Sequence, residues 1–392
     1  MDGAAAKREV CDAVDGRAAA LIDISQQIHA HPELAFEETF AHDLLTEAIE
    51  GAGLSVERSA FGLDTAFAAR AGSSGPNIAV CCEYDALPGL GHACGHNIIA
   101  AAGLGAGLAA ATVADRLGGQ VTILGTPAEE GGGGKVYMID AGAFADVDAA
   151  MMLHPADANL SRMNTIAIHQ IMVDYHGKSA HAAAAPQHGR NALDAAVLGY
   201  NGVAALRQHI APDERIHGVF TDGGDKPNIV PQHASMHWYI RSTTLATLEP
   251  LKQRVLACLQ AGADAAGCTM TYEWKDPSYA DMVEVDPMLA AYAANAEALG
   301  RVTETPTAES AVIGSTDMGN VSYVVPSIHP MIQVAPERCA IHTPEFASYA
   351  ASSHGDAAVV DGAKALAMTI VDLWTDAHLL AEAAAAHGAA LG

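Results

Sequence analysis

Three apolar segments each run into ionisable residues, and this pattern constrains the fold more than any other feature of the chain. Residues 78–85 read IAVCCEYD, residues 121–130 read VTILGTPAEE and residues 149–154 read AAMMLH. Each apolar run is typical of a buried strand, and residues 96–117 between the first two have the pattern of a long helix. Strands that alternate with helices predict an α/β layer with a mostly parallel sheet, whose polar strand ends meet at one edge.

The pattern changes at about residue 166. The following residues predict a strand, a helix, two strands, a helix and a last strand, an order typical of a small α+β module of ferredoxin-like type. Helices of the first kind resume after this module. We therefore expect a discontinuous main domain with an inserted domain, the boundaries being residues 1–165 and 280–392 for the former and 166–279 for the latter.

Composition narrows the functional classes. The chain has 392 residues and a formal net charge of −26, which disfavours nucleic acid and anionic membranes as partners because phosphate binding needs basic patches. No apolar run reaches membrane-spanning length without a glycine or a charge. The first residues carry acids where a signal peptide is apolar, so we expect a cytoplasmic protein. The seven cysteines are an odd number, which argues against a disulfide framework.

The segment GHACGHN, residues 91–97, offers a thiol and an imidazole two residues apart. Side chains at that spacing point the same way in an extended segment, so Cys94 and His96 could bind one metal ion or two adjacent ions. Glu129 and Glu130 are adjacent carboxylates, of which one could bind a metal and the other transfer protons. Taken singly, each residue also fits a structural role.

Two further histidines complete a set that is more specific than its members. His154 follows an apolar strand and precedes a proline, and His342 lies in AIHTPEF, also near a proline. A cysteine, histidines and a glutamate, with a spare glutamate, are the ligands and base typical of a hydrolytic metal site.

Seven segments together resemble the aminoacylase and carboxypeptidase G superfamily of di-metal exopeptidases. The resemblance is strongest to its amidohydrolase branch, which includes indoleacetyl-amino-acid hydrolases, p-aminobenzoyl-glutamate hydrolase and β-alanyl-lysine dipeptidases. It covers nearly the whole chain. The segments, in order, are EYDALPGLGHACGHN, GTPAEEGGGGK, MMLHP, GKSAHAAAAPQHGRNALDA, GGDKPNIVPQHA, GSTDMGNVSYVVPSIHP and IHTPEF.

The resemblance implies a role for most of these residues. Glu129 would be the general base and Asp85 a carboxylate that orients a ligand. His181, in the inserted domain, would stabilise the oxyanion, in dimeric relatives from the partner subunit, and Asn228 would bind substrate. The ligands of two divalent ions, Zn²⁺ or Mn²⁺, would be Cys94, His96, Glu130, His154 and His342.

Two residues raise separate questions. Arg241 ends an apolar strand of the inserted domain, where it could bind a substrate carboxylate or form an ordinary salt bridge. Asn97 follows His96 where many members of the branch have aspartate, which puts the metal preference in doubt. The edge strands of the inserted lid domain need covering, so we expect a homodimer formed through it.

The function expected is metal-dependent hydrolysis of an amide bond in an N-acyl amino acid or a dipeptide. A water molecule acidified by the metal ions would attack, with a glutamate as general base. Two alternatives remain at this point. Cys94 could be the nucleophile of a thiol amidase, with His92 or His96 as its base. The chain could also be a non-catalytic metal-binding or peptide-binding protein with the same fold.

Overall fold

The chain divides into two units near residues 164 and 281. The computed structural model describes residues 3–307 and 313–392. The main unit comprises residues 1–164 and 282–392, and the inserted unit comprises residues 165–281. Each unit has its own sheet and its own apolar core.

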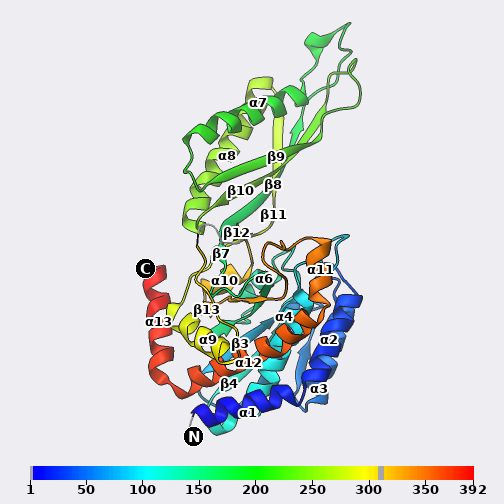
Figure 1. Ribbon diagram of the computed structural model, residues 1–392. Coiled ribbons are helices and arrows are strands. Elements are labelled where there is room, and N and C mark those ends of the chain that lie inside the picture. The colour runs from blue at the N-terminus through cyan, green and yellow to red at the C-terminus, as the bar shows by residue number, and fades with distance from the viewer. Residues whose placement is uncertain (1–2, 308–312) are drawn as a thin grey trace. The chain divides into compact units, whose positions relative to one another are not determined.

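A six-stranded sheet in the order β1-β2-β4-β3-β5-β13 forms the centre of the main unit (Figure 1). The strands β4, β3, β5 and β13 pair in parallel, and β1 and β2 pair antiparallel with their neighbours. All six residues of β3 are buried, which explains the unbroken apolar run of its sequence. The bounds are β1 (Val56–Arg58), β2 (Phe67–Ala71), β3 (Asn77–Cys82), β4 (Gln120–Gly125), β5 (Ala149–Met151) and β13 (Ser327–Ile328).

Helix α4 (His96–Ala111) packs against this sheet and against α2 and α12 (Figure 1). Its residues from His96 to Ala110 are all buried. A Cβ atom at Gly103 would lie 2.8 Å from Cys82 Sγ, and one at Gly107 would lie 2.4 Å from Ile123 Cγ1. The glycines and alanines of GLGAGLAAA therefore serve close packing of the helix on the sheet.

The predicted continuous helix over residues 96–117 is wrong, because α4 ends at Ala111 and a separate α5 covers Ala114–Leu117. The Thr112 hydroxyl donates to the Ala109 carbonyl at 2.7 Å, a local hydrogen bond that favours termination. The other helices of the main unit are α1 (Gly3–Asp15), α2 (Ala18–Ala30), α3 (Thr39–Gly51), α6 (Gly134–Asp140), α9 (Asp286–Ala298), α10 (Met318–Ser322), α11 (Pro344–Ala350), α12 (Ser353–Thr375) and α13 (Ala377–Leu391), with short 3₁₀ turn η1 (Ala60–Gly62).

The carboxyl ends of β3, β4 and β5 lie at one edge of the sheet, since these strands are parallel. A short parallel pair, β6 (His154–Ala156) with β14 (Met331–Gln333), follows β5. After β4 the chain turns sharply, with Ala128 in the left-handed conformation at φ 63°. The buried carboxylate of Glu38 accepts a hydrogen bond of 2.9 Å from the Ala128 amide and so holds this turn.

The inserted unit is a four-stranded antiparallel sheet in the order β11-β8-β10-β9, with two helices, α7 and α8, packed on it (Figure 1). Side chains of β8 alternate between buried and partly exposed, as expected for a sheet covered on one face. Among the described residues, no helix is both long enough and apolar enough to cross a membrane. The bounds are β8 (Ala167–His176), α7 (Ala192–Leu206), β9 (Arg215–Asp222), β10 (His233–Ser242), α8 (Leu245–Ala266) and β11 (Thr269–Tyr279), with η2 (Pro186–His188) and η3 (Arg207–His209); short strands β7 (Asn164–Thr165) and β12 (Ile313–Gly314) complete the chain.

Substitutions in the turn between β4 and α6 can measure how tightly the fold fixes the residues that follow β4. A Cβ atom at Gly134 would lie 2.0 Å from the backbone oxygen of Pro127, whereas one at Gly131 meets nothing within 4 Å in the described part of the chain. Gly134→Ala must displace backbone, so we expect a loss of about 1–3 kcal/mol in the free energy of unfolding. Urea denaturation measures it, with Gly131→Ala as the matched control. Equal midpoints for the two variants would contradict this account of the turn.

Candidate metal centre

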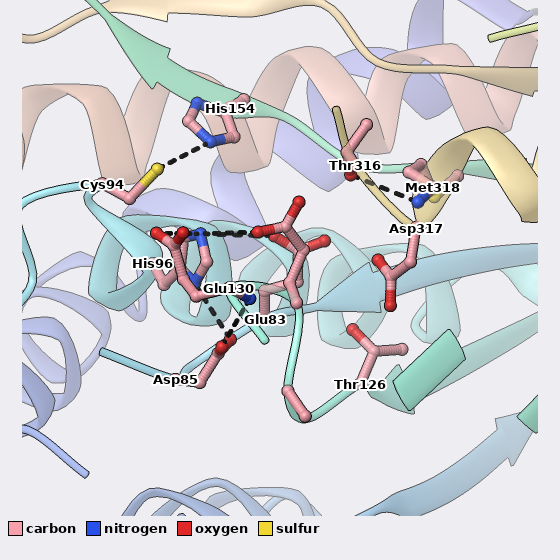
Figure 2. Close-up of polar contacts among 12 residues, drawn as sticks. Glu83, Asp85, Cys94, His96, Thr126, Glu130, His154, Thr316, Asp317 and Met318 are labelled. Atoms are coloured by element: carbon pink, nitrogen blue, oxygen red, sulfur yellow. Dashed lines mark hydrogen bonds and ion pairs between the residues drawn. The ribbon is translucent and has the colours of Figure 1, made fainter. Parts of the chain in front are cut away.

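Cys94 and His154 face each other across the sheet edge (Figure 2). Cys94 Sγ lies 3.4 Å from His154 Nε2. The other ring nitrogen, His154 Nδ1, lies 2.7 Å from the carbonyl oxygen of Pro155, which can only accept, so Nδ1 carries the proton and Nε2 presents its lone pair to the sulfur. Burial, with His329 and His96 nearby, lowers the pKa of His154 to about 3, so this imidazole is neutral. Two ligands of one zinc ion are about 3.5 Å apart, given Zn–S and Zn–N bonds of about 2.3 and 2.0 Å.

His96 is oriented by Asp85. His96 Nδ1 lies 3.1 Å from one carboxylate oxygen of Asp85, and the second oxygen of Asp85 accepts a hydrogen bond of 2.8 Å from the Glu130 amide (Figure 2). Asp85 therefore links the segment after β3 to the segment after β4. Burial opposes a charge on His96, but the hydrogen bond and the negative charge of Asp85 raise its pKa well above the ordinary value.

The second nitrogen of His96 faces acidic side chains. His96 Nε2 lies 3.7 Å from a carboxylate oxygen of Glu83 and 3.8 Å from one of Glu129 and one of Glu130. Within residues 3–307 and 313–392 it is buried without a hydrogen-bond partner. Because the pKa of His96 is raised, this nitrogen carries a proton that faces the carboxylates, and a metal ion can take the place of that proton.

The adjacent acids Glu129 and Glu130 differ in their protonation. Burial, together with the negative charges of Glu83 and Glu130, raises the pKa of Glu129 well above its ordinary range. Burial acts on Glu130 in the same direction, but its hydrogen bond with His342 and the charge of His96 outweigh it and lower the pKa of Glu130. Glu129 is thus suited to carrying a proton and Glu130 to staying ionised as a ligand.

His342 approaches the centre from a loop before α11. Its Nε2 lies 3.5 Å from Glu130 Oε1, and its side chain is half-exposed. Its backbone amide donates to the Ala93 carbonyl at 2.8 Å, next to Cys94, and its φ of 62° is left-handed. This strained backbone turns the ring toward Glu130.

Three groups of side chains each bring their ligand atoms within 4.8 Å of one another, so each could hold a metal ion. Together they contain all five ligands expected from the sequence. Beyond those five ligands, the groups contain two more acids, Glu83 and Glu129. The groups are Cys94, His96 and His154; Cys94, Glu130 and His342; and Glu83, His96 and Glu129.

The charges of this region fit two divalent cations. Among the described residues, five carboxylates with one lysine lie buried or nearly so at the sheet edge, so negative charge is in excess there when they are ionised, even with a proton on His96. Buried charge of one sign is costly without counter-ions. The thiol and imidazoles favour zinc among common ions, and the carboxylates also suit manganese. The residues counted are Glu83, Asp85, Glu129, Glu130, Asp317 and Lys135.

Sequence reasoning missed Glu83 and Lys135. Lys135 Nζ lies 2.5 Å from Glu83 Oε1 and 2.6 Å from Asp317 Oδ1, and all three side chains are fully buried. The spacing of Glu83 and Asp85, two residues apart in an extended segment, was the available signal. Lys135 gave none, because a lysine after a glycine run is typically exposed.

Asn97 does not face the metal ligands. Its amide nitrogen donates to Ser25 Oγ at 2.9 Å and to the Ala350 carbonyl at 3.2 Å, so it ties α4 to α2 and α11. An aspartate here could not donate to the Ala350 carbonyl. His92 is buried, and neither ring nitrogen has a hydrogen-bond partner among the described residues. It belongs to none of the three ligand groups.

His181 and Asn228 lie together in the inserted unit. The Ala182 amide donates to the Asn228 carbonyl at 3.0 Å, and His181 pairs with Ile229 as an isolated bridge. His181 Nδ1 accepts from the amides of Ala183 and Ala184, so Nε2 carries the proton and the exposed ring presents an N–H donor. That donor suits an oxyanion.

Arg241 lies far from those two residues within the inserted unit. It is at the end of β10, whereas the chain reaches His181 from the end of β8 that pairs with His233. A strand advances about 3.3 Å per residue, which separates Arg241 from His233 by about 26 Å. Its guanidinium lies over the Tyr239 ring, 5.9 Å from the centroid.

Comparison with known proteins agrees with the geometry. The sequence pattern of peptidase family M20/M25/M40 matches residues 79–372. The Xaa-Arg dipeptidase of Mus musculus is 40% identical over 386 residues, which cover 94% of this chain and 88% of that protein. One of the subunits of p-aminobenzoyl-glutamate hydrolase from Escherichia coli strain K12 is 30% identical over 453 residues, which cover 97% and 94%.

Two solved structures share the fold. An aminobenzoyl-glutamate utilization protein from Klebsiella pneumoniae has a TM-score of 0.77 at 19% identity and covers 94% of this chain and 99% of its own. A dinuclear metal binding peptidase of the M20 family from Bacillus subtilis has a TM-score of 0.71 at 18% identity and covers 92% and 99%.

The fold, the site and these relatives define a metal-dependent amidohydrolase. The chain belongs to peptidase family M20/M25/M40, which confirms the resemblance found in the sequence.

Metal affinity should rise with pH, because a metal ion must displace the proton that the raised pKa retains on His96. Each displaced proton changes the affinity about tenfold per pH unit. Competition with a chromophoric chelator at several pH values measures this slope. Asp85→Asn removes the charge that raises the pKa of His96, so its slope should be shallower. A slope equal to that of the unmodified protein would contradict the role given to Asp85.

Proposed function

We propose that the enzyme binds two divalent metal ions through Cys94, His96, Glu130, His154 and His342 and hydrolyses the amide bond of a dipeptide or an N-acyl amino acid. The observation that carries this proposal is His96 Nε2, which is buried and faces carboxylates at 3.7–3.8 Å with no hydrogen-bond partner in the described residues. Among the three ligand groups, Cys94 and His96 each occur twice, as expected where two ions are neighbours.

Glu129 is the general base of this proposal. The metal ions, when bound, acidify the attacking water and polarise the amide carbonyl. Glu129 takes a proton from the water and delivers it to the leaving amine. Its position beside His96, and a pKa raised by burial and by neighbouring carboxylates, support a group that gains and returns a proton. Asp85 holds His96, and Glu130 remains ionised as a ligand.

A thiol nucleophile is the less favoured chemistry for Cys94. Burial raises the pKa of its thiol well above the ordinary value, and the facing His154, with a pKa of about 3, is too weak a base to form an ion pair with it. A metal ion between the two would stabilise the thiolate directly. Removal of metal by a chelator abolishes a metal-dependent activity and leaves a thiol amidase active.

Glu129→Gln should lower kcat by at least a thousandfold and leave two metal ions bound, because the amide keeps the shape of the carboxylate but cannot accept the proton. Glu130→Gln is the matched control, and it should instead weaken metal binding. Turnover of dipeptides and N-acyl amino acids, with metal analysis of each variant, gives the result. Near-native turnover by metal-loaded Glu129→Gln would show that the base lies elsewhere.

The substrate proposed is a dipeptide with a cationic carboxyl-terminal residue. Two observations support it: the relative that shares 40% identity is an Xaa-Arg dipeptidase, and the net charge of −26 attracts cationic substrates. A glutamate conjugate such as p-aminobenzoyl-glutamate is the competing substrate, named by the relative at 30% identity.

We also propose that the enzyme is a homodimer in which His181 and Asn228 of the inserted unit bind the substrate and the oxyanion. The N–H that His181 presents to solvent supports this role. The edge strand β9 supports dimerisation, since Val219 and Phe220 on it are 61% and 42% exposed.

Arg241 stays a candidate for the substrate carboxylate. The seven free cysteines support a reducing, cytoplasmic location, and zinc or manganese suits the ligands.

Mixing two inactive variants tests whether His181 acts across the dimer. If it does, Glu129→Gln and His181→Ala subunits, co-expressed in equal amounts, form heterodimers with one intact site, and activity should return to about a quarter of the wild-type value. Activity is measured on the mixture and on each variant alone. If the mixture stays as inactive as its components, His181 acts in its own subunit or not at all.

A further inference from the structure

Glu83 is the acid of the centre that no ligand assignment explains. It lies directly after β3, and its side chain is fully buried. A buried carboxylate is retained only where positive charge or hydrogen bonds compensate it. The groups that surround Glu83 therefore indicate what it does.

One oxygen of Glu83 is held by Lys135. Lys135 Nζ lies 2.5 Å from Glu83 Oε1, and it also lies 2.6 Å from Asp317 Oδ1. The second oxygen of Asp317 accepts a hydrogen bond of 2.9 Å from the Lys135 amide. Asp317 contacts both the amide and the ammonium group of Lys135, and Glu83 contacts the ammonium group alone. Two carboxylates share one ammonium group, so the three side chains together keep one negative charge in excess.

The other oxygen of Glu83 points to the metal centre. Glu83 Oε2 lies 3.7 Å from His96 Nε2, and no described residue donates a hydrogen bond to it. Glu83, His96 and Glu129 form one of the groups whose ligand atoms could share an ion. In Figure 2, Glu83 lies between Asp317 on one side and the pair His96 and Glu130 on the other. The excess charge therefore faces the position where a cation would lie.

We propose that Glu83 is a further protein contact of the metal pair, and that Lys135 is a positioning residue that holds its carboxylate toward His96. The inference rests on the two-metal site of the proposed function. One ammonium group serves two carboxylates here, so one negative charge is left for a metal ion to compensate, and Glu83 Oε2 is the oxygen of the trio that faces His96.

Two variants that each remove one acidic partner of Lys135 separate this role from a purely structural one. Glu83→Gln should weaken the affinity for one of the two ions at least tenfold. Asp317 also contacts Lys135 but belongs to no ligand group, so Asp317→Asn should change that affinity less than threefold. The apo-proteins are titrated with Zn²⁺ and with Mn²⁺ against a chromophoric chelator. The rise in Tm on adding metal provides a second readout, since binding to the folded state stabilises it.

A third variant covers the case in which Glu83→Gln fails to fold. Glu83→Asp keeps the charge beside Lys135 but withdraws it from His96 by one methylene, so it should also lose affinity for one ion. Unchanged affinity for both ions in whichever of these variants folds would overturn the inference. So would an equal loss in Asp317→Asn. Metal binding is measured without turnover. If the wild-type protein and a Glu83 variant both bind two ions with the same affinity, the role of Glu83 is rejected and the proposed function stays intact.

Discussion

Concentrated negative charge at the carboxyl edge of the main sheet is the constraint on which the rest of the site depends. In the described part of the chain, five carboxylates are buried there, or nearly so, together with Lys135, and burial makes each uncompensated charge costly. Two side chains in the site can offset this negative charge. Lys135 lies between Glu83 and Asp317, and the imidazole of His96, whose pKa is raised, faces Glu83, Glu129 and Glu130. An ionised cluster of this kind needs cations, and the donors present are those that bind zinc and manganese.

The surrounding fold holds these groups in place through close packing and a few buried hydrogen bonds. Parallel strands bring the segments after β3, β4 and β5 to one edge. Helix α4 begins at His96, directly after the loop that carries Cys94. The small residues of α4 then let the helix lie close to the sheet. Left-handed backbone at Ala128 and His342 directs the side chains beside them, and Glu38 and the Ala93 carbonyl hold those two conformations by hydrogen bonds.

The sequence indicates the residues proposed as metal ligands better than it indicates their environment. Cys94, His96 and Glu130 lie at strand ends or in glycine-rich loops, and their chemistry is visible in short motifs. The partnership of Glu83, Lys135 and Asp317 is not, because it joins residues up to 234 positions apart and depends on burial that a local pattern cannot show. Asn97 illustrates the reverse error: its neighbour His96 suggested a role at the metals, but the helix turns its side chain toward Ser25 and Ala350.

The opposite pKa shifts of the adjacent acids Glu129 and Glu130 fit the roles proposed for them, Glu130 as a ligand and Glu129 as the base. Glu130 is next to His342 and receives the charge-stabilising contacts, whereas Glu129 is directed toward Glu83 and deeper burial. The negative charge of Glu83 acts on Glu129 and favours its protonated form. A divalent ion bound beside His96 would oppose that effect and lower the cost of ionising Glu129. The protonation of the base and the occupancy of the metal site are thus coupled through the same buried charges.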